Sequence, residues 1–138
     1  MATPIKFGTD GWRAEIGFDF NENNLRRLMH SVGRRINDMV DGRAHVCVGY
    51  DTRFKARDFS SIAVECLISE GCHVLFSQSF CPTPSLSLAV KKLEADLGVQ
   101  ITASHNPYTY LGVKLKGSNG GPLSSDIISQ IESEIESE

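Results

Sequence analysis

Residues 97–107, LGVQITASHNP, decide the fold class, because an apolar run ends abruptly in polar, turn-forming residues. The first seven residues have the length and apolar content of a buried strand. Pro107 disfavours helical backbone at Asn106, so we expect the following loop to be extended or turned. Ser104 would then expose its hydroxyl on a stiff support. A surface turn is the plain interpretation, and a reactive serine at the mouth of a site is the alternative.

Helices and strands are predicted to alternate around this segment. Apolar residues at helical spacing predict helices at 24–40, 56–70, about 83–95, and from Ser124 or Ser125 onward. Runs rich in strand-forming residues predict strands at 44–51, 73–78, 97–103 and 112–117. Gly71 is expected to end one helix, and Thr83 to cap another before a first-turn Pro84. The alternation predicts an α/β fold with a mostly parallel sheet and helices on both faces.

The composition is that of one globular domain. The chain has 138 residues, of which 41% are hydrophobic and 22% charged, so a core can form. The net charge of -3 argues against nucleic acid or anionic lipid as a partner, and no apolar run is long enough to span a membrane. No export signal opens the chain. We interpret Cys47 and Cys66 as reduced packing residues, as in a cytoplasmic protein.

The last residues, 131–138, read IESEIESE and contain four glutamates with no basic residue. Carboxylates at a helix C-terminus oppose the helix dipole, and neither glycine nor proline stops the helix. A frayed, solvated acidic end is one interpretation. The other, which we favour, is that this chain is the front part of a longer protein.

Three polar loops follow the predicted parallel strands, at 49–57, 78–85 and 104–110. In an open α/β sheet, ligands bind outside the carboxyl ends of such strands, so we expect these loops to converge. The plain alternative for Asp51, Thr52 and Arg53 is loop capping with a salt bridge. For residues 81–84, CPTP, the plain alternative is helix initiation.

The sequence argues against a serine hydrolase. A free serine is a weak nucleophile and needs an adjacent base. His105 follows Ser104 directly, and neighbours in an extended segment point in opposite directions. The chain also lacks a G-x-S-x-G motif.

Two further clusters could bind an anion. Residues 7–17, FGTDGWRAEIG, combine glycines that allow close backbone approach with Arg13, whose guanidinium suits phosphate. Residues 112–122, GVKLKGSNGGP, place Lys114 and Lys116 on one face of a strand by simple alternation. A tight turn and the polar face of an edge strand are the plain alternatives.

Taken together, these motifs resemble the first domain of the α-D-phosphohexomutases, the phosphoglucomutase and phosphomannomutase family. They are FGTDGWRA at 7–14, VGYDTRF at 48–54, PTP at 82–84, TASHNP at 102–107 and SNGGP at 118–122. The resemblance implies that residues 1–138 form one three-layer α/β/α sandwich with a mixed sheet. It also implies that later domains complete the enzyme. The family usually has an asparagine where this chain has Leu111.

The resemblance assigns roles to four residues. Ser104 would carry the transferable phosphoryl group, and His105 would assist proton transfer or orientation beside the substrate. Lys114 would act as a general acid or base, and Arg13 would support the phosphoryl group. The phosphate on Ser104 would supply one ligand to Mg²⁺, with the other ligands in a later domain.

The implied activity moves a phosphoryl group between two hydroxyls of a hexose phosphate through a hexose bisphosphate. The partners would be these sugars and the remaining domains, and the first domain alone would be inactive. The alternative is a non-catalytic domain that binds sugar phosphates or regulates. The retained Ser104, His105, Lys114 and Arg13 favour the enzyme, whereas Leu111 and the missing domains favour the alternative.

Overall fold

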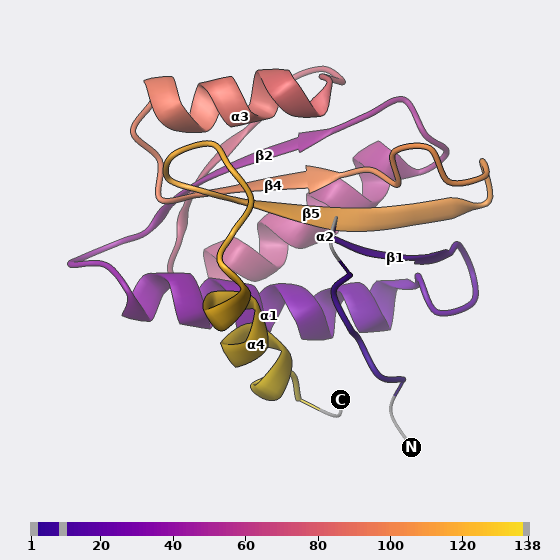
Figure 1. Ribbon diagram of the computed structural model, residues 1–138, viewed down its shortest axis with the longest axis horizontal. Helices are drawn as coiled ribbons and strands as arrows, with labels where there is room; N and C mark the ends of the chain where they lie inside the picture. The colour runs from indigo at the N-terminus through magenta and orange to yellow at the C-terminus, as the bar shows by residue number, and fades with distance from the viewer. Residues whose placement is uncertain (1–2, 9–10, 137–138) are drawn as a thin grey trace.

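A five-stranded sheet lies between two layers of helices in the computed structural model, which describes residues 3–8 and 11–136 (Figure 1). The strands are β1 (Trp12–Glu15), β2 (His45–Tyr50), β3 (His73–Phe76), β4 (Leu97–Ile101) and β5 (Tyr110–Gly117). The helices are α1 (Glu22–Asp38), α2 (Ala56–Ser69), α3 (Thr83–Lys92) and α4 (Ser125–Ser133). Helix α3 covers one face of the sheet, and α1 and α2 cover the other, with α4 beside α1. The expected α/β/α sandwich is confirmed.

The strand order is β1-β5-β4-β2-β3. Strand β2 pairs in parallel with β3 and β4, whereas β5 pairs antiparallel with β4 and β1. Strand β5 therefore runs against the other four, which share one direction. This is the mostly parallel, mixed sheet that the sequence predicted.

The core forms where the periodic apolar residues of α1 meet the sheet. Leu25, Leu28, Met29 and Val32 of α1 are fully buried. All five residues of β4 are buried as well, as expected for a strand covered by helices on both faces. Strand β4 thus provides a rigid base for the loop that begins at residue 102.

Every helix and strand that the sequence predicted is present, and β1 is an additional strand that it missed. The sequence of β1 is only WRAE, too short to show a clear period. Its partner β5 is about a hundred residues away in the chain, with Trp12 opposite Val113. Short strands of this kind depend on the neighbour that supplies their hydrogen bonds.

The two helix boundaries expected at Gly71 and Thr83 differ in outcome. Gly71 follows α2 with a φ of 96°, and its N–H donates to the Ile68 carbonyl, so the C-terminal glycine is confirmed. Thr83, however, is the first helical residue of α3, and Pro82 occupies the N-cap position in extended backbone. Proline suits a helix start because it has no N–H group that would be left without a partner there. Its fixed φ is also compatible with the start of a helix.

The end of α3 also differs from the expectation. The helix ends at Lys92, because Glu94 adopts a left-handed φ of 53° and the Ala95 N–H donates to the Val90 carbonyl. The same type of turn ends α2, where Gly71 takes the left-handed position; after α3 that position is taken by Glu94. Leu93, which follows the last helical residue, is 58% exposed.

The acidic end of the chain is paired with helix α1. Glu134 forms an ion pair with Arg35, and Glu136 lies 3.5 Å from Arg34. Glu132 accepts a 2.7 Å hydrogen bond from the Phe7 N–H. These glutamates therefore have partners in the fold, while the Glu136 side chain remains 68% exposed, as expected for a solvated end. The basic partners were invisible in the local sequence because they lie about a hundred residues earlier.

Gly112 lies inside β5, and its missing side chain leaves space beside the neighbouring strand β1. A Cβ atom there would stand 2.4 Å from the Trp12 carbonyl oxygen and 2.6 Å from Cγ of Arg13. Gly112 is the register partner of Arg13. The missing side chain lets β1 approach and lets the Arg13 side chain cross β5.

Substituting Gly112→Ala should lower the free energy of unfolding by about 2 kcal/mol, because the added methyl overlaps backbone atoms of β1. Gly117→Ala is the matched control, since its Cβ would meet no atom closer than 3.6 Å. That control should change stability by less than about 1 kcal/mol. Urea unfolding of both variants measures the difference, and equal losses would contradict this role of Gly112.

Candidate active site

The loops that follow β2, β3 and β4 meet at one edge of the sheet, as expected. The Asp51 N–H donates to the Ile101 carbonyl at 3.2 Å, and the Cys81 N–H donates to the Tyr50 carbonyl at 2.9 Å. The buried Gln100 side chain donates to the Cys81 carbonyl at 2.7 Å. These three bonds connect the ends of neighbouring strands, so polar groups from separate loops share one site.

Ser104 adopts a strained conformation in this edge. Its φ is 53°, in the left-handed region that disfavours residues with a Cβ atom. The Asn106 N–H closes a tight turn by donating to the Ala103 carbonyl at 3.0 Å. Ser104 is exposed at the tip of that turn. Since such backbone costs about 1–2 kcal/mol, the surrounding contacts must hold it.

The amide side of Ser104 is held through Thr102 and Asp51. The Ser104 N–H donates to Oγ1 of Thr102 at 3.1 Å, and the Thr102 hydroxyl donates to Oδ2 of Asp51. The other carboxylate oxygen of Asp51 accepts the Arg53 N–H at 2.9 Å. Asp51 therefore caps its own loop and braces the serine turn.

The carbonyl side of this turn is held by Arg53. Its guanidinium donates to four backbone carbonyls: Ser104 at 2.5 Å, Asn106 at 2.7 Å, Pro107 at 2.8 Å and Tyr110 at 3.2 Å. Nε of Arg53 also lies 3.7 Å from Oδ2 of Asp51. The plain alternative of loop capping with a salt bridge is thus confirmed for this pair. The contacts reach across to a second loop, which the local sequence did not indicate.

Arg13 reaches the same loop from β1. Its Nη1 donates to Oδ1 of Asn106 at 2.7 Å, two residues after Ser104. The side chain follows the space left by Gly112 in β5. The structure therefore brings Arg13 and the serine loop together although 93 residues separate the bonded pair in sequence.

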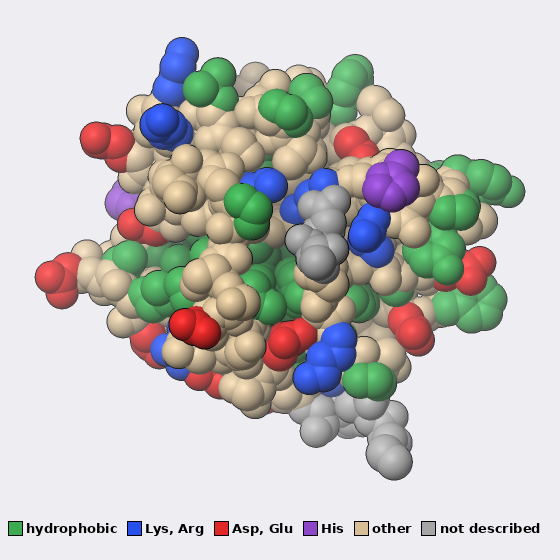
Figure 2. All heavy atoms as spheres, viewed as in Figure 1, with side chains coloured by type: hydrophobic (Ala, Val, Ile, Leu, Met, Phe, Trp, Pro, Cys, Tyr) green, Lys and Arg blue, Asp and Glu red, His purple; other side chains and the backbone are tan. Residues whose placement is uncertain are grey.

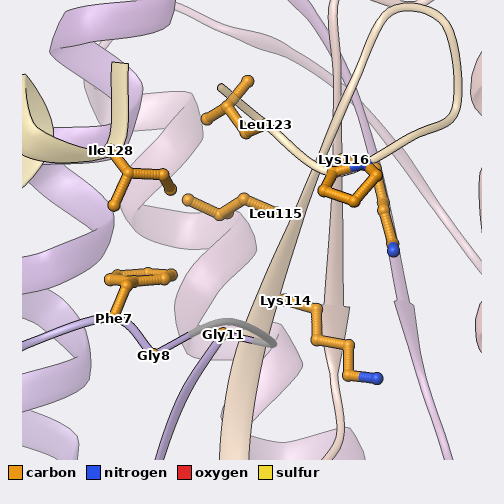
Figure 3. A pocket seen from close by; sticks show the side chains of 9 residues that line it. Phe7, Gly8, Gly11, Lys114, Leu115, Lys116, Leu123 and Ile128 are labelled. Atoms are coloured by element: carbon orange, nitrogen blue, oxygen red, sulfur yellow. The ribbon is translucent and has the colours of Figure 1, made fainter. Parts of the chain in front are cut away.

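Lys114 and Lys116 project from the same face of β5, as predicted. Figure 3 shows both side chains on one side of the strand and Leu115 on the other, toward Phe7 and Ile128. Lys114 is the register partner of Gln100, whereas Lys116 is opposite Gly98. Lys114 is thus two positions nearer than Lys116 to the strand end that leads to Ser104.

Leu111 leaves the strand that carries Lys114 intact. It is fully buried and pairs with Ala14, and β5 continues without interruption from Tyr110 to Gly117. The position is therefore a core position, where an apolar side chain packs well. Leu111 therefore leaves the register of Lys114 regular.

His105 is exposed in the turn beside Ser104. In Figure 2, a histidine lies at the upper right with a lysine or arginine side chain directly beside it, over the end of the sheet where β2 and β4 finish in Figure 1. Basic side chains at this edge suit an anionic ligand, despite the chain's net charge of -3.

The N-terminal motif packs against β5 beside Lys114. Gly11 has a φ of 92°, and a Cβ atom there would stand 2.4 Å from the Val113 carbonyl oxygen. Glycine is thus required both by conformation and by close approach. Gly8, Gly11, Lys114 and Lys116 share the small hollow drawn in Figure 3. Thr9 and Asp10 of the motif lie outside the described residues.

Metal ligands and reactive thiols are scarce at this edge. Residues 3–8 and 11–136 contain no group of three or more His, Cys, Asp or Glu side chains that could hold a metal ion. All four cysteines are free, and burial raises the pKa of Cys47 and Cys66. Burial raises the pKa of Cys72 to about 11. The packing role expected for Cys47 and Cys66 is confirmed by their burial.

The sequence analysis missed two residues that organise the serine turn, Thr102 and Asn106. Both belong to the TASHNP motif, and both are polar at positions where a buried strand ends. That pattern is the available signal. Their partners, Asp51 and Arg13, could be identified only after the strands were placed side by side.

Comparison with known proteins gives a consistent family. The family described as "Phosphoglucomutase/phosphomannomutase, alpha/beta/alpha domain I" matches residues 4–138. A phosphoglucomutase of Staphylococcus epidermidis is 35% identical over 138 residues, which cover 99% of this chain and 25% of the relative. A probable phosphoglucosamine mutase of Thermococcus gammatolerans is 38% identical over 131 residues, covering 95% of this chain and 28% of the relative.

A solved structure agrees with these relatives. The crystal structure of a putative phosphomannomutase from Thermus thermophilus superposes with a TM-score of 0.95 at 40% identity, covering all of this chain and 31% of that one. None of the helices within the described residues is long and apolar enough to cross a membrane. The chain spans about a quarter of the length of the two curated relatives. It belongs to the phosphoglucomutase/phosphomannomutase family and corresponds to the α/β/α domain I of that family.

Proposed function

We propose that this chain is the phosphoserine-bearing first domain of a phosphohexomutase, an isomerase that moves a phosphoryl group within a hexose phosphate. The observation that carries the proposal is Ser104 itself. This serine is exposed at the carboxyl end of β4, in a left-handed turn braced from both sides. Relatives named phosphoglucomutase and phosphoglucosamine mutase support hexose phosphates as the substrate class.

The proposed reaction begins with a phosphate on Oγ of Ser104. The free hydroxyl of the sugar attacks this phosphorus, the bond from phosphorus to Oγ breaks, and a hexose bisphosphate forms. The sugar hydroxyl loses its proton to a base. Oγ of Ser104 is the leaving group, and it accepts a proton as it leaves. After the bisphosphate reorients, Ser104 takes the other phosphoryl group by the reverse step.

The remaining residues would position charge around this transfer. Phosphoryl transfer depends mainly on alignment and on stabilisation of charge. Lys114 is proposed as the general acid or base, and His105 as a group that assists proton transfer or orients the sugar. Arg13 would support the phosphoryl group from its position on Asn106.

Mg²⁺ is proposed as the cofactor, with one ligand from the phosphate on Ser104. Phosphate oxygen is a ligand that Mg²⁺ prefers, and Ser104 is exposed enough to offer it. The carboxylate of Asp51 is engaged by Thr102 and Arg53, so we place the remaining ligands in a later domain. When bound, the ion would neutralise charge on the phosphoryl oxygens.

We place the enzyme in the cytoplasm, which the four free cysteines support, since reduced thiols are usual there. A non-catalytic domain that binds sugar phosphates remains the alternative function. The two differ in turnover: the alternative predicts ligand binding by the full-length protein with no isomerisation. A coupled assay of glucose, mannose and glucosamine phosphates with the full-length protein separates them.

Replacing Ser104→Ala in the full-length enzyme should reduce mutase turnover to near background, because the phosphoryl acceptor is removed. Intact-mass measurement and peptide mapping after incubation with a hexose bisphosphate should place one phosphate on Ser104. Ser124→Ala, in the N-cap of α4, is the control and should retain both turnover and phosphate. Phosphate on another serine, with Ser104 unmodified, would contradict the proposal.

Lys114→Ala should lower the maximal rate of the full-length enzyme by about 10²-fold or more, the scale for a lost proton-transfer group. Lys116→Ala should lower it by less than about tenfold, because a cation two positions further along β5 interacts more weakly with the transferred group. Steady-state kinetics of the two variants provide the comparison. Equal losses, or a larger loss at Lys116, would show that the catalytic lysine is wrongly assigned.

The 138-residue chain alone should not isomerise hexose phosphates at a measurable rate, since its relatives are about four times as long. The coupled assay should be run on this chain and on the full-length protein at equal concentration. Circular dichroism of the isolated chain checks that it is folded. Turnover by the folded chain comparable to that of the full-length protein would refute the need for later domains.

A further inference from the structure

We propose that Arg53 is a positioning residue for Ser104: its guanidinium holds the left-handed turn by binding carbonyls throughout residues 104–110. The inference rests on the proposed function of Ser104 as the phosphoryl carrier. It adds a residue that acts on the reaction only through the backbone of the serine loop.

The donors of Arg53 are nearly all directed at the protein. A guanidinium has five N–H donors. Nη1 donates to two carbonyls and Nη2 to two more, while Nε faces the Asp51 carboxylate at 3.7 Å. The side chain is only 14% exposed. Arg53 therefore has little capacity left to bind a sugar phosphate directly.

The same contacts fix both sides of the Ser104 residue. Its carbonyl accepts from Arg53, and its N–H is held by Thr102, whose hydroxyl is bound in turn by Asp51. Asp51 and Arg53 lie two residues apart after β2 and contact each other. A φ of 53° at a residue with a Cβ atom persists only where surrounding contacts determine it. The hydrogen bond from Arg53 and the hydrogen bonds through Thr102 to Asp51 are the contacts that hold it.

The set of acceptors also couples two parts of the site. Ser104 and Asn106 lie in the turn, whereas Tyr110 begins β5, the strand that carries Lys114. One side chain therefore sets the turn relative to that strand. A lysine could not replace it, because an ammonium group has three donors on one nitrogen and lacks the planar fork.

Loss of this support should appear in turnover more than in substrate binding. A displacement of about 1 Å at a reacting group can lower the rate about 10²-fold. In the full-length enzyme, Arg53→Ala should therefore lower kcat by about 10²-fold and change KM by less than about threefold. Arg53→Lys should recover less than about a tenth of the lost rate.

Arg43→Ala is the matched control. Arg43 also donates to backbone carbonyls, those of Gly71 and Cys72, but lies before β2 and away from the serine loop. It should keep kcat within about twofold of the parent, the scale of neutral surface changes. Millimolar guanidinium chloride should restore at least part of kcat in Arg53→Ala, because the free ion can occupy the vacated position. The same salt should give no gain in Arg43→Ala.

A second readout is independent of activity. In the full-length enzyme, Arg53→Ala should speed hydrogen exchange at the Asn106 amide, which closes the turn on Ala103, while Arg43→Ala leaves it unchanged. If the alanine variant does not fold, Arg53→Lys carries both tests and should show the same kcat loss and faster exchange. Unchanged kcat, a loss confined to KM, or unchanged exchange in a folded Arg53 variant would overturn the proposal. If the parent enzyme is inactive but hydrogen exchange is faster in Arg53→Ala, the proposed function is refuted. The role of Arg53 in holding the Ser104 turn is then still supported.

Discussion

Strand β4 pairs with β2 on one side and with β5 on the other, and this double pairing brings the loop after β2 and the strand that carries Lys114 beside the strand that leads to Ser104. Because β2 runs parallel to β4, its end delivers Asp51 and Arg53 to the same edge of the sheet. Because β5 runs antiparallel, it returns from that edge with Lys114 opposite Gln100. The complete burial of β4 gives this arrangement little freedom to shift.

Two arginines meet the serine loop in different ways. Arg13 binds the side-chain amide of Asn106, whereas Arg53 binds backbone carbonyls and is largely buried. An arginine that is exposed to a ligand can contribute charge to catalysis, and one that is saturated by carbonyls can contribute only geometry. The distinction explains how a chain of net negative charge can both hold a strained turn and present positive charge at its surface.

Distant ends of the chain complete the support of the site. Gly112 gives β1 room to pair with β5 and gives Arg13 a path to the loop. On the far side of the same sheet, the glutamates after residue 131 pair with arginines of α1 and with the Phe7 amide. Helix α4 and the N-terminal segment are thereby attached to the helical layer that contains α1.

The sequence by itself determined the α/β class, the existence of nearly all helices and strands, and the convergence of three loops, because these follow from local periodicity and from the geometry of parallel strands. It also identified Ser104 as the residue to examine, since a serine between a buried strand and an Asn-Pro turn is locally conspicuous. It could not reveal β1, the helix partners of the terminal glutamates, or the carbonyls bound by Arg53. Each of these depends on hydrogen bonds or ion pairs between residues roughly fifty to a hundred positions apart. Only tertiary packing brings such partners together, because no local pattern records which distant segment will lie alongside.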